Sequence, residues 1–158
     1  MHERDRKKIY QAREELAKKK PQIQPDHIVA ALSFGFWTSL FDTRYEHNQI
    51  LWPRLLKPTF SGLPKGQRTR LFLSRELNRT RFLRNRISHY EPIWHWQDLA
   101  TQHDMITNLL GYLSPAASQY LGMFGRFKTI YFDGKPHIET RLKALEGLHI
   151  TQRELITE

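Results

Sequence analysis

The chain contains no cysteine, and its apolar residues form no long uninterrupted run. The absence of cysteine excludes disulfides and thiolate metal sites, and it fits a reducing compartment. The most apolar stretch, residues 28–40, is too short to cross a bilayer and is interrupted by small polar residues. The first 20 residues are rich in charge, unlike a signal peptide. We therefore expect a cytoplasmic protein that does not bind membranes.

Acidic residues are scarce in one part of the chain. Residues 65–89 hold eight basic residues against one acid, Glu76, which gives this segment +7 of the chain's net charge of +9. Seven of the eight are arginine, whose planar guanidinium suits phosphate better than an ammonium does. A charge run usually marks a solvated helix face, but this composition favours a surface that binds a polyanion. The basic residues are Lys65, Arg68, Arg70, Arg75, Arg79, Arg81, Arg84 and Arg86.

The apolar content predicts one folded domain spanning residues 1–158. Apolar residues make up 39% of the 158 residues, enough for a core. Their spacing favours an all-α class with antiparallel helices, because the expected connections are short. The signals weaken after residue 124, so residues 124–158 are expected to be peripheral. Helices are expected over 3–20, 27–41, 45–56, 67–89, 98–113, 115–123 and 141–146, with a loop at 61–66 and a short strand and turn over 129–134.

The end of the 67–89 helix carries residues suited to phosphate chemistry. Arg84, Asn85 and His89 lie within six residues, and Glu91-Pro92 is expected to end the helix there. Arginine holds a phosphate with permanently charged donors, whereas histidine gives and takes protons near neutral pH. The other reading of these residues is structural: Arg84 would extend to the helix end, and His89 would interact with the helix dipole.

A helical projection separates Arg84 from its basic neighbours. At about 100° per residue, Arg84 falls on the face of Leu73, Leu77, Leu83 and Ile87, which predicts that it lies on a packing face. His89 falls roughly 140° away from Arg84 on an ideal helix. The two side chains would meet if the last turn opened or if a second subunit supplied one of them.

These residues resemble a known pattern. Arg84-Asn85-x-x-x-His89 resembles the signature of the HEPN superfamily, and the longer phrase FLRNRISHYEPI at 82–93 is similar to the motif region of its Abi-like (abortive infection) family. The upstream segment ALSFGFW at 31–37, followed by Leu51-Trp52, also resembles that family. Tyr90 stands where many relatives have a second histidine. Relatives commonly have further helices before the part that resembles residues 9–60, which leaves open that this chain is a shortened member.

The resemblance implies an antiparallel helical bundle that forms a homodimer through the motif helix. It also implies a metal-independent endoribonuclease without a cofactor, acting in phage defence or as a toxin, with an antitoxin or a phage trigger as further partners. His89 would then act as general base or acid, Arg84 would hold the scissile phosphate, and Asn85 would position the phosphate or the histidine. The RNA would be left with a 2′,3′-cyclic phosphate. The residues expected to bind RNA are Arg75, Arg79, Arg81 and Arg86.

Other interpretations are weaker. His89, Glu91 and His95 do not have a standard zinc spacing, and Pro92 lies between them, so no metal site is expected. No phosphate-binding glycine loop or nucleophile elbow is present. A helical DNA-binding regulator is disfavoured because no turn between two short helices fits that motif. The main alternative is a non-catalytic RNA-binding or protein-interaction module with the same fold.

Overall fold

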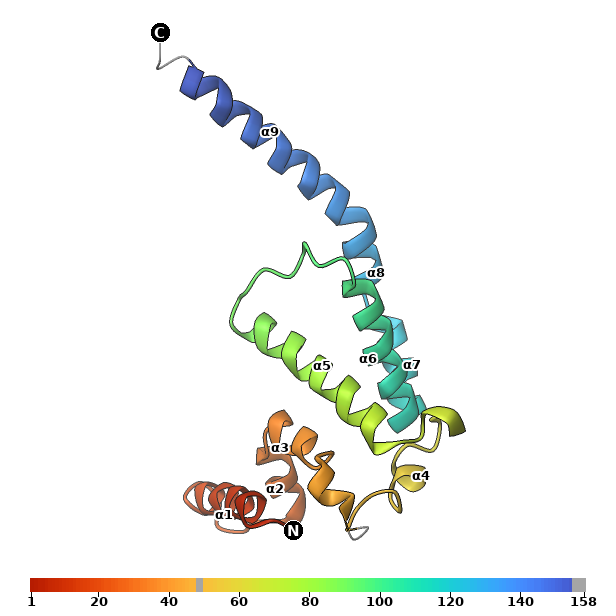
Figure 1. Ribbon diagram of the computed structural model, residues 1–158. Helices are drawn as coiled ribbons and strands as arrows, with labels where there is room; N and C mark the ends of the chain where they lie inside the picture. Colours follow the sequence, from red (N-terminus) through yellow and green to blue (C-terminus); the bar gives the residue numbers. More distant parts are fainter. Residues whose placement is uncertain (48–49, 155–158) are drawn as a thin grey trace. The chain divides into compact units, whose positions relative to one another are not determined.

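The computed structural model describes residues 1–47 and 50–154, and these residues form helices, turns and loops without any strand (Figure 1). The prediction of an all-α fold is therefore confirmed. Within the same residues, none of the helices has the length and apolar character needed to cross a membrane.

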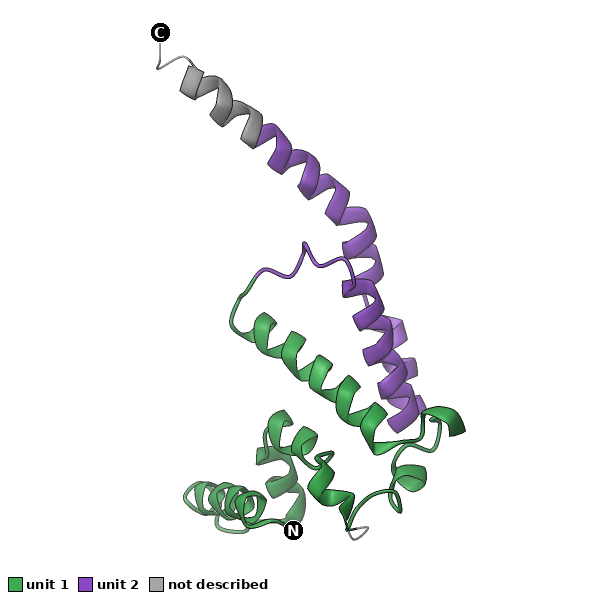
Figure 2. Cartoon of the chain, in the orientation of Figure 1, with its two compact units in different colours: residues 1–91 green, residues 92–158 purple. Residues whose placement is uncertain are grey.

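The chain forms two compact units, residues 1–91 and 92–158 (Figure 2). The expected single domain and the antiparallel bundle stay predictions. The first unit carries the motif and ends just after it. Its helical elements are α1 (Glu3–Ala17), α2 (Pro25–Ala31), α3 (Phe34–Ser39), η1 (Thr43–Tyr45), α4 (Leu56–Thr59), η3 (Lys65–Gln67) and α5 (Arg70–Ser88).

The core of the first unit is largely aromatic. Phe41 stacks on Trp52 with ring centroids 4.5 Å apart, and Phe60 meets Phe41 edge-on. The indole Nε1–H of Trp52 donates to the carbonyl of Leu40 at 2.7 Å, so this buried ring also satisfies its polar atom. Leu73 of α5 is completely buried. These contacts hold the loops between α3 and α5 in place. The motif helix, expected from residue 67, begins at Arg70.

The helix expected over 27–41 is wrong, because the chain forms two short helices there instead. The backbone of Leu32 is extended, with a ψ of 133°, and this ends α2. The hydroxyl of Ser33 then accepts the backbone N–H of Phe36 at 3.2 Å, which caps a new helix, α3. A serine that caps a helix competes with continuation of the preceding one, since its side chain replaces a helical backbone bond.

The helix expected over 45–56 is also wrong for the described residues in that range. The carbonyl of Tyr45 accepts the backbone N–H groups of Leu51 at 3.0 Å and Trp52 at 3.3 Å. These bonds close a loop that is wider than a helical turn. Regular helix resumes only at α4, after Pro53, which has no backbone N–H to donate.

The second unit confirms the predicted helices near 98–113 and 115–123. It consists of α6 (Leu99–Leu113), α7 (Pro115–Phe124), α8 (Phe127–Thr129), the π-helical turn η4 (Ile130–Gly134) and α9 (Lys135–Glu154). The last of these includes the helix expected over 141–146.

The strand and turn expected over 129–134 are wrong. Phe127, Tyr131 and Lys135 follow one another at four-residue spacing along one helical face. The rings of Phe127 and Tyr131 stack with centroids 5.3 Å apart, and the ammonium of Lys135 lies 3.4 Å from the Tyr131 hydroxyl. Gly134 does not adopt a positive φ, so it makes no turn. This spacing favours helix over strand.

Candidate functional site at the end of helix α5

Helix α5 begins with a side-chain cap and carries most of the basic side chains of residues 65–89. The hydroxyl of Thr69 accepts the backbone N–H of Phe72 at 3.1 Å, which satisfies one of the free donors of the first turn. Regular helix then continues to Ser88. The side chains of the motif therefore follow from ideal helical geometry.

Two of the arginines that were expected to bind RNA form ion pairs with a buried acid of the same helix. Glu76 is 1% exposed, and its carboxylate lies 2.6 Å from Arg75 Nε and 3.6 Å from Arg79 Nη1. A buried carboxylate without a partner would destabilise the fold, and these two arginines provide the opposite charge that prevents this. Both arginine side chains remain more than half exposed, so an additional anion can reach them.

The other two arginines of that group lie in different surroundings. Arg86 forms an ion pair with Glu91 at 2.8 Å, which links the helix to the segment that follows it. Arg81 lines a polar pocket beside α1 and α3. By helical spacing Arg75, Arg79 and Arg86 share one side of α5, whereas Arg81 lies on another side.

The helix ends in a Schellman motif at the histidine. The backbone N–H of Tyr90 donates to the carbonyl of Ile87 at 3.0 Å, and that of Glu91 donates to the carbonyl of Arg86 at 3.0 Å. Tyr90 has a φ of 57°, the left-handed conformation that this motif requires and that glycine usually supplies. The motif ends the helix before the Glu91-Pro92 pair. It also fixes His89 as the last residue before the chain turns.

Arg84 is exposed, which corrects the prediction of a packing face from the helical projection. Its side chain is exposed, although neighbouring Leu83 is only 6% exposed. Its Nη1 lies 3.4 Å from Asn85 Oδ1, within reach of a weak hydrogen bond. Ile87, one turn later, is 52% exposed. The apolar face predicted for α5 is thus covered at Leu73 and Leu83 but open beside Arg84.

The last turn of α5 stays closed, so the histidine and the arginine remain on different faces. The backbone N–H of His89 donates to the carbonyl of Asn85 at 3.0 Å, and the hydroxyl of Ser88 donates to the carbonyl of Arg84 at 2.8 Å. Within the described residues no hydrogen bond or ion pair joins Arg84 to His89. One chain therefore presents both groups to solvent without bringing them together.

His89 shares its face of the helix with two other polar residues. Arg81, Asn85 and His89 follow at four-residue spacing, so their side chains line one side of α5. All three are exposed. At about 1.5 Å per residue they span roughly 12 Å along the helix axis. This row provides a cation, an amide and an imidazole on one surface.

A metal site at His89, Glu91 and His95 was the weaker interpretation of these residues. Among the residues whose side chains the structure describes, no group of three or more histidine, aspartate or glutamate residues could hold a metal ion. Glu91 instead pairs with Arg86.

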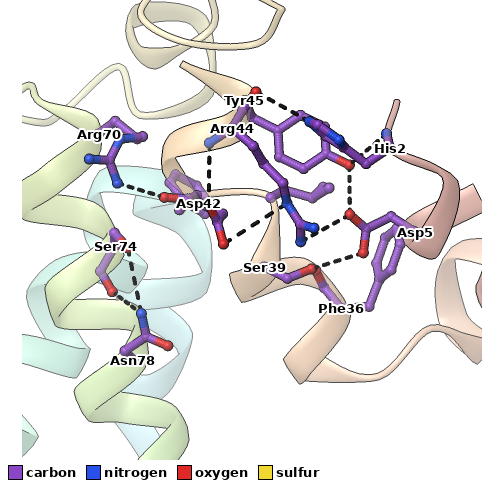
Figure 3. Close-up of polar contacts among 12 residues, drawn as sticks. His2, Asp5, Phe36, Ser39, Asp42, Arg44, Tyr45, Arg70, Ser74 and Asn78 are labelled. Carbon is purple, nitrogen blue, oxygen red and sulfur yellow. Dashed lines mark hydrogen bonds and ion pairs between the residues drawn. The ribbon is translucent and has the colours of Figure 1, made fainter. Parts of the chain in front are cut away.

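A buried polar cluster in the first unit was not predicted from the sequence. Asp5 of α1 is completely buried, and its carboxylate accepts the hydroxyl of Tyr45 at 2.7 Å and lies 3.2 Å from Arg44 Nη2 (Figure 3). Ser39 Oγ and Lys8 Nζ lie 3.5 and 3.8 Å from the same carboxylate. Asp5 and Tyr45 are forty residues apart in the chain. No local spacing could have indicated this contact.

The pKa of Tyr45 is raised above its ordinary value of 10.0, because the phenol is buried and because it donates to the Asp5 carboxylate. The neutral phenol is thus favoured in the folded state. Its contribution to stability is complete below the pKa of the unfolded chain, near 10, and is lost as the pH rises through the higher folded value.

Tyr45→Phe is therefore expected to destabilise the first unit more at pH 8 than at pH 10.5. At pH 8 the variant loses a hydrogen bond to a buried charge, at a cost of roughly 1–3 kcal/mol. Above pH 10 the wild type loses stability through ionisation of the unfolded tyrosine, and the variant does not. Urea unfolding of wild type and variant at the two pH values measures the difference in the free energy of unfolding. The control is Tyr10→Phe, at an exposed position of α1, which is expected to change stability by less than about 0.5 kcal/mol at pH 8. A difference for Tyr45→Phe that grows with pH would contradict the expectation.

The chain was compared with protein-family models, with curated proteins and with solved structures, and no match was found in any of the three.

Proposed function

We propose that this protein is a metal-independent endoribonuclease of the HEPN, Abi-like type that works as a homodimer, in phage defence or as a toxin. The observation that carries the proposal is the placement of Arg84, Asn85 and His89. All three are exposed at the end of α5, where the predicted catalytic groups would be accessible to RNA. Arginine and histidine together supply the phosphate contact and the proton transfer that RNA cleavage needs.

The reaction would be an in-line displacement at phosphorus. The 2′-oxygen of the ribose attacks the adjacent phosphate, the bond to the 5′-oxygen of the next nucleotide breaks, and a 2′,3′-cyclic phosphate remains. His89 would accept the 2′-hydroxyl proton or protonate the leaving oxygen. Arg84 would bind the non-bridging oxygens and stabilise the charge that builds up on them. Asn85 would orient the phosphate through its amide.

The separation of Arg84 from His89 within one chain supports a dimer. A second copy whose α5 lies against the first would place Arg84 of one subunit opposite His89 of the other, which completes the site. An exposed apolar side chain beside Arg84 favours such an arrangement, because Ile87, three residues after Arg84, is 52% exposed and a second copy would cover it. Light scattering at micromolar concentration should give the mass of a dimer, and a monomer would remove the shared site.

RNA would approach along the row of Arg81, Asn85 and His89. Arg81 lies two turns before His89 on the same face and can hold a neighbouring phosphate. Arg75 and Arg79 would add to the binding of RNA with their exposed donors, while still balancing Glu76. This electrostatic contribution weakens steeply with salt.

The second candidate is a non-catalytic module that binds RNA or protein. This candidate applies if the protein is a monomer, because a single chain carries a basic surface on which Arg84 and His89 do not meet. The two candidates differ in whether RNA is cut.

Cleavage of RNA by the purified protein in excess EDTA tests the proposal. We expect cleavage to persist in EDTA and the new 3′ ends to carry cyclic phosphate, since the proposed groups are side chains of the protein. End-group analysis by mass spectrometry identifies the product. Loss of cleavage in EDTA would contradict the metal-independent mechanism, and binding of RNA without cleavage would favour the second candidate.

A further inference from the structure

A polar pocket lies among α1, η1, α3 and α5 of the first unit, and its lining includes Arg81 but none of Arg84, Asn85 and His89. Its volume is about 370 Å³, which is within the range of sites for small ligands. Five of its lining side chains are cations, contributed by three separate segments of the chain. They are Arg4, Lys8, Arg44, Arg70 and Arg81.

Positive charge exceeds negative charge in this pocket. Asp42 is the one acid among the lining residues, and its Oδ1 accepts the backbone N–H of Arg44 at 3.2 Å. Asp5 and Glu46 pair with Arg44 and Arg70, and even with both included the cations outnumber the acids by five to three. Cations gathered in a concave surface repel one another, and an anion relieves that repulsion.

Two of the cations are held in place by the fold. The side chain of Arg70 is only 10% exposed; its Nε lies 2.6 Å from Glu46 Oε2, and its Nη1 donates to the carbonyl of Phe41 at 2.8 Å. The side chain of Arg44 is 25% exposed and lies between Asp5 and Asp42 (Figure 3). These contacts fix both guanidinium groups before any ligand arrives, which lowers the entropy cost of binding.

Arg44 also has an unused donor. Its Nε is buried, and no hydrogen-bond acceptor within the described residues reaches it; the nearest carboxylate oxygen, of Asp42, is 3.9 Å away. Buried donors of this kind are normally satisfied. This unsatisfied donor adds to the positive charge at the wall of the pocket.

Two of the remaining cations, Arg4 and Arg81, are available to a ligand. Within the part of the chain that the structure describes, neither Arg4 nor Arg81 takes part in an ion pair. Both are exposed, one on α1 and one on α5. Ser74 and Asn78 add a hydroxyl and an amide from the same side of α5 as Arg81.

We propose that this pocket binds a small phosphorylated ligand through its terminal phosphate groups, such as pyrophosphate or the phosphate tail of a nucleotide. Arg44 and Arg70 would contact the terminal phosphate, which enters deepest, and Arg4, Lys8 and Arg81 would contact the phosphate next to it. Guanidinium groups bind phosphate with paired, charge-assisted hydrogen bonds. The proposal does not depend on ribonuclease activity.

The depth of the cations favours a small ligand over an RNA strand. Arg44 and Arg70 are largely buried, so only a group that enters the pocket can reach them. A terminal phosphate has three free oxygens and a single substituent. An internal phosphodiester of RNA has two free oxygens and a sugar on each side, which hinders its entry.

Isothermal titration calorimetry on the full chain tests the proposal, with pyrophosphate and ATP as separate ligands in about 150 mM salt to screen loose surface binding. We expect saturable binding with one site per chain. Arg4→Gln and Arg81→Gln should each weaken binding about tenfold, because each removes one charge-assisted contact. Both side chains are exposed, so the variants should fold, which circular dichroism checks.

Arg13→Gln is the matched control. Arg13 is exposed on α1 and lies nine residues from Arg4, which places it about 180° around the helix from that residue. We expect its affinity to stay within about twofold of wild type. Absence of saturable binding by the wild type, or equal weakening by Arg13→Gln, would overturn the proposal. It would also be overturned if Arg81→Gln weakened binding of a single-stranded RNA while neither small phosphate bound, because the pocket would then serve RNA.

Discussion

His89→Ala is expected to lower the rate of RNA cleavage about a thousandfold, because general acid–base catalysis by a positioned histidine contributes roughly 10²–10⁴ in rate. The imidazole of His89 is exposed at the end of α5, so its removal leaves no cavity. The variant should therefore keep its fold and still bind RNA. Single-turnover cleavage of a labelled RNA, with binding measured separately by fluorescence anisotropy, distinguishes lost chemistry from lost binding.

His95→Ala is the matched control for that experiment. His95 is also exposed but belongs to the second unit, and it has no part in the proposed reaction. Cleavage by this variant should stay within about twofold of wild type. Wild-type rates in His89→Ala would contradict the proposed role of the histidine. A large loss in both variants would revive the metal interpretation that groups His89 with His95.

Asp5→Ala is expected to destabilise the first unit by about 3–5 kcal/mol, since it leaves a partly buried arginine and a buried phenol without their shared acceptor. Small domains are stable by only about 5–15 kcal/mol in total, so the effect should be large. The carboxylate also links α1 to the segment that contains Arg44 and Tyr45. Urea unfolding followed by circular dichroism measures the loss.

Asp26→Ala controls for the loss of an acid in the first turn of a helix. Asp26 occupies that position in α2, as Asp5 does in α1, but it is exposed. Its removal should cost no more than about 1 kcal/mol, the usual value of such a charge near a helix N-terminus. Similar losses in the two variants would show that the buried contacts of Asp5 add nothing to stability.

The sequence predicted the helices that local signals define. Thr69 and Pro115 begin helices close to the expected positions, and the apolar spacing of 98–113 corresponds to α6. These features depend on caps and periodicity, which lie within a few residues of one another. The same reasoning failed at Ser33, whose side chain caps a new helix within an apolar run. It also failed at Tyr45, whose carbonyl accepts two N–H groups from six and seven residues later, a pattern that a helix does not have.

The sequence indicated which residues make up the candidate site, but not which of their side chains are exposed or in contact. The order of Arg84, Asn85 and His89 showed which residues share a helix end, and the projection showed the angle between the arginine and the histidine. It did not show that Arg84 would be exposed, because burial depends on what packs against α5. The Asp5 cluster and the basic pocket escaped prediction for a related reason. Their members come from segments that only the folded chain brings together.

A mixing experiment tests the shared dimeric site most directly. His89→Ala and Arg84→Ala should each be inactive alone, since each removes one group from both sites of the dimer. If Arg84 of one subunit works with His89 of the other, a mixed dimer regains one complete site. Equal amounts of the two variants, unfolded together and refolded, should form mixed dimers as about half of the population, and the cleavage rate should recover to roughly a quarter of the wild-type value. Formation of mixed dimers without any recovery of cleavage would contradict the shared site.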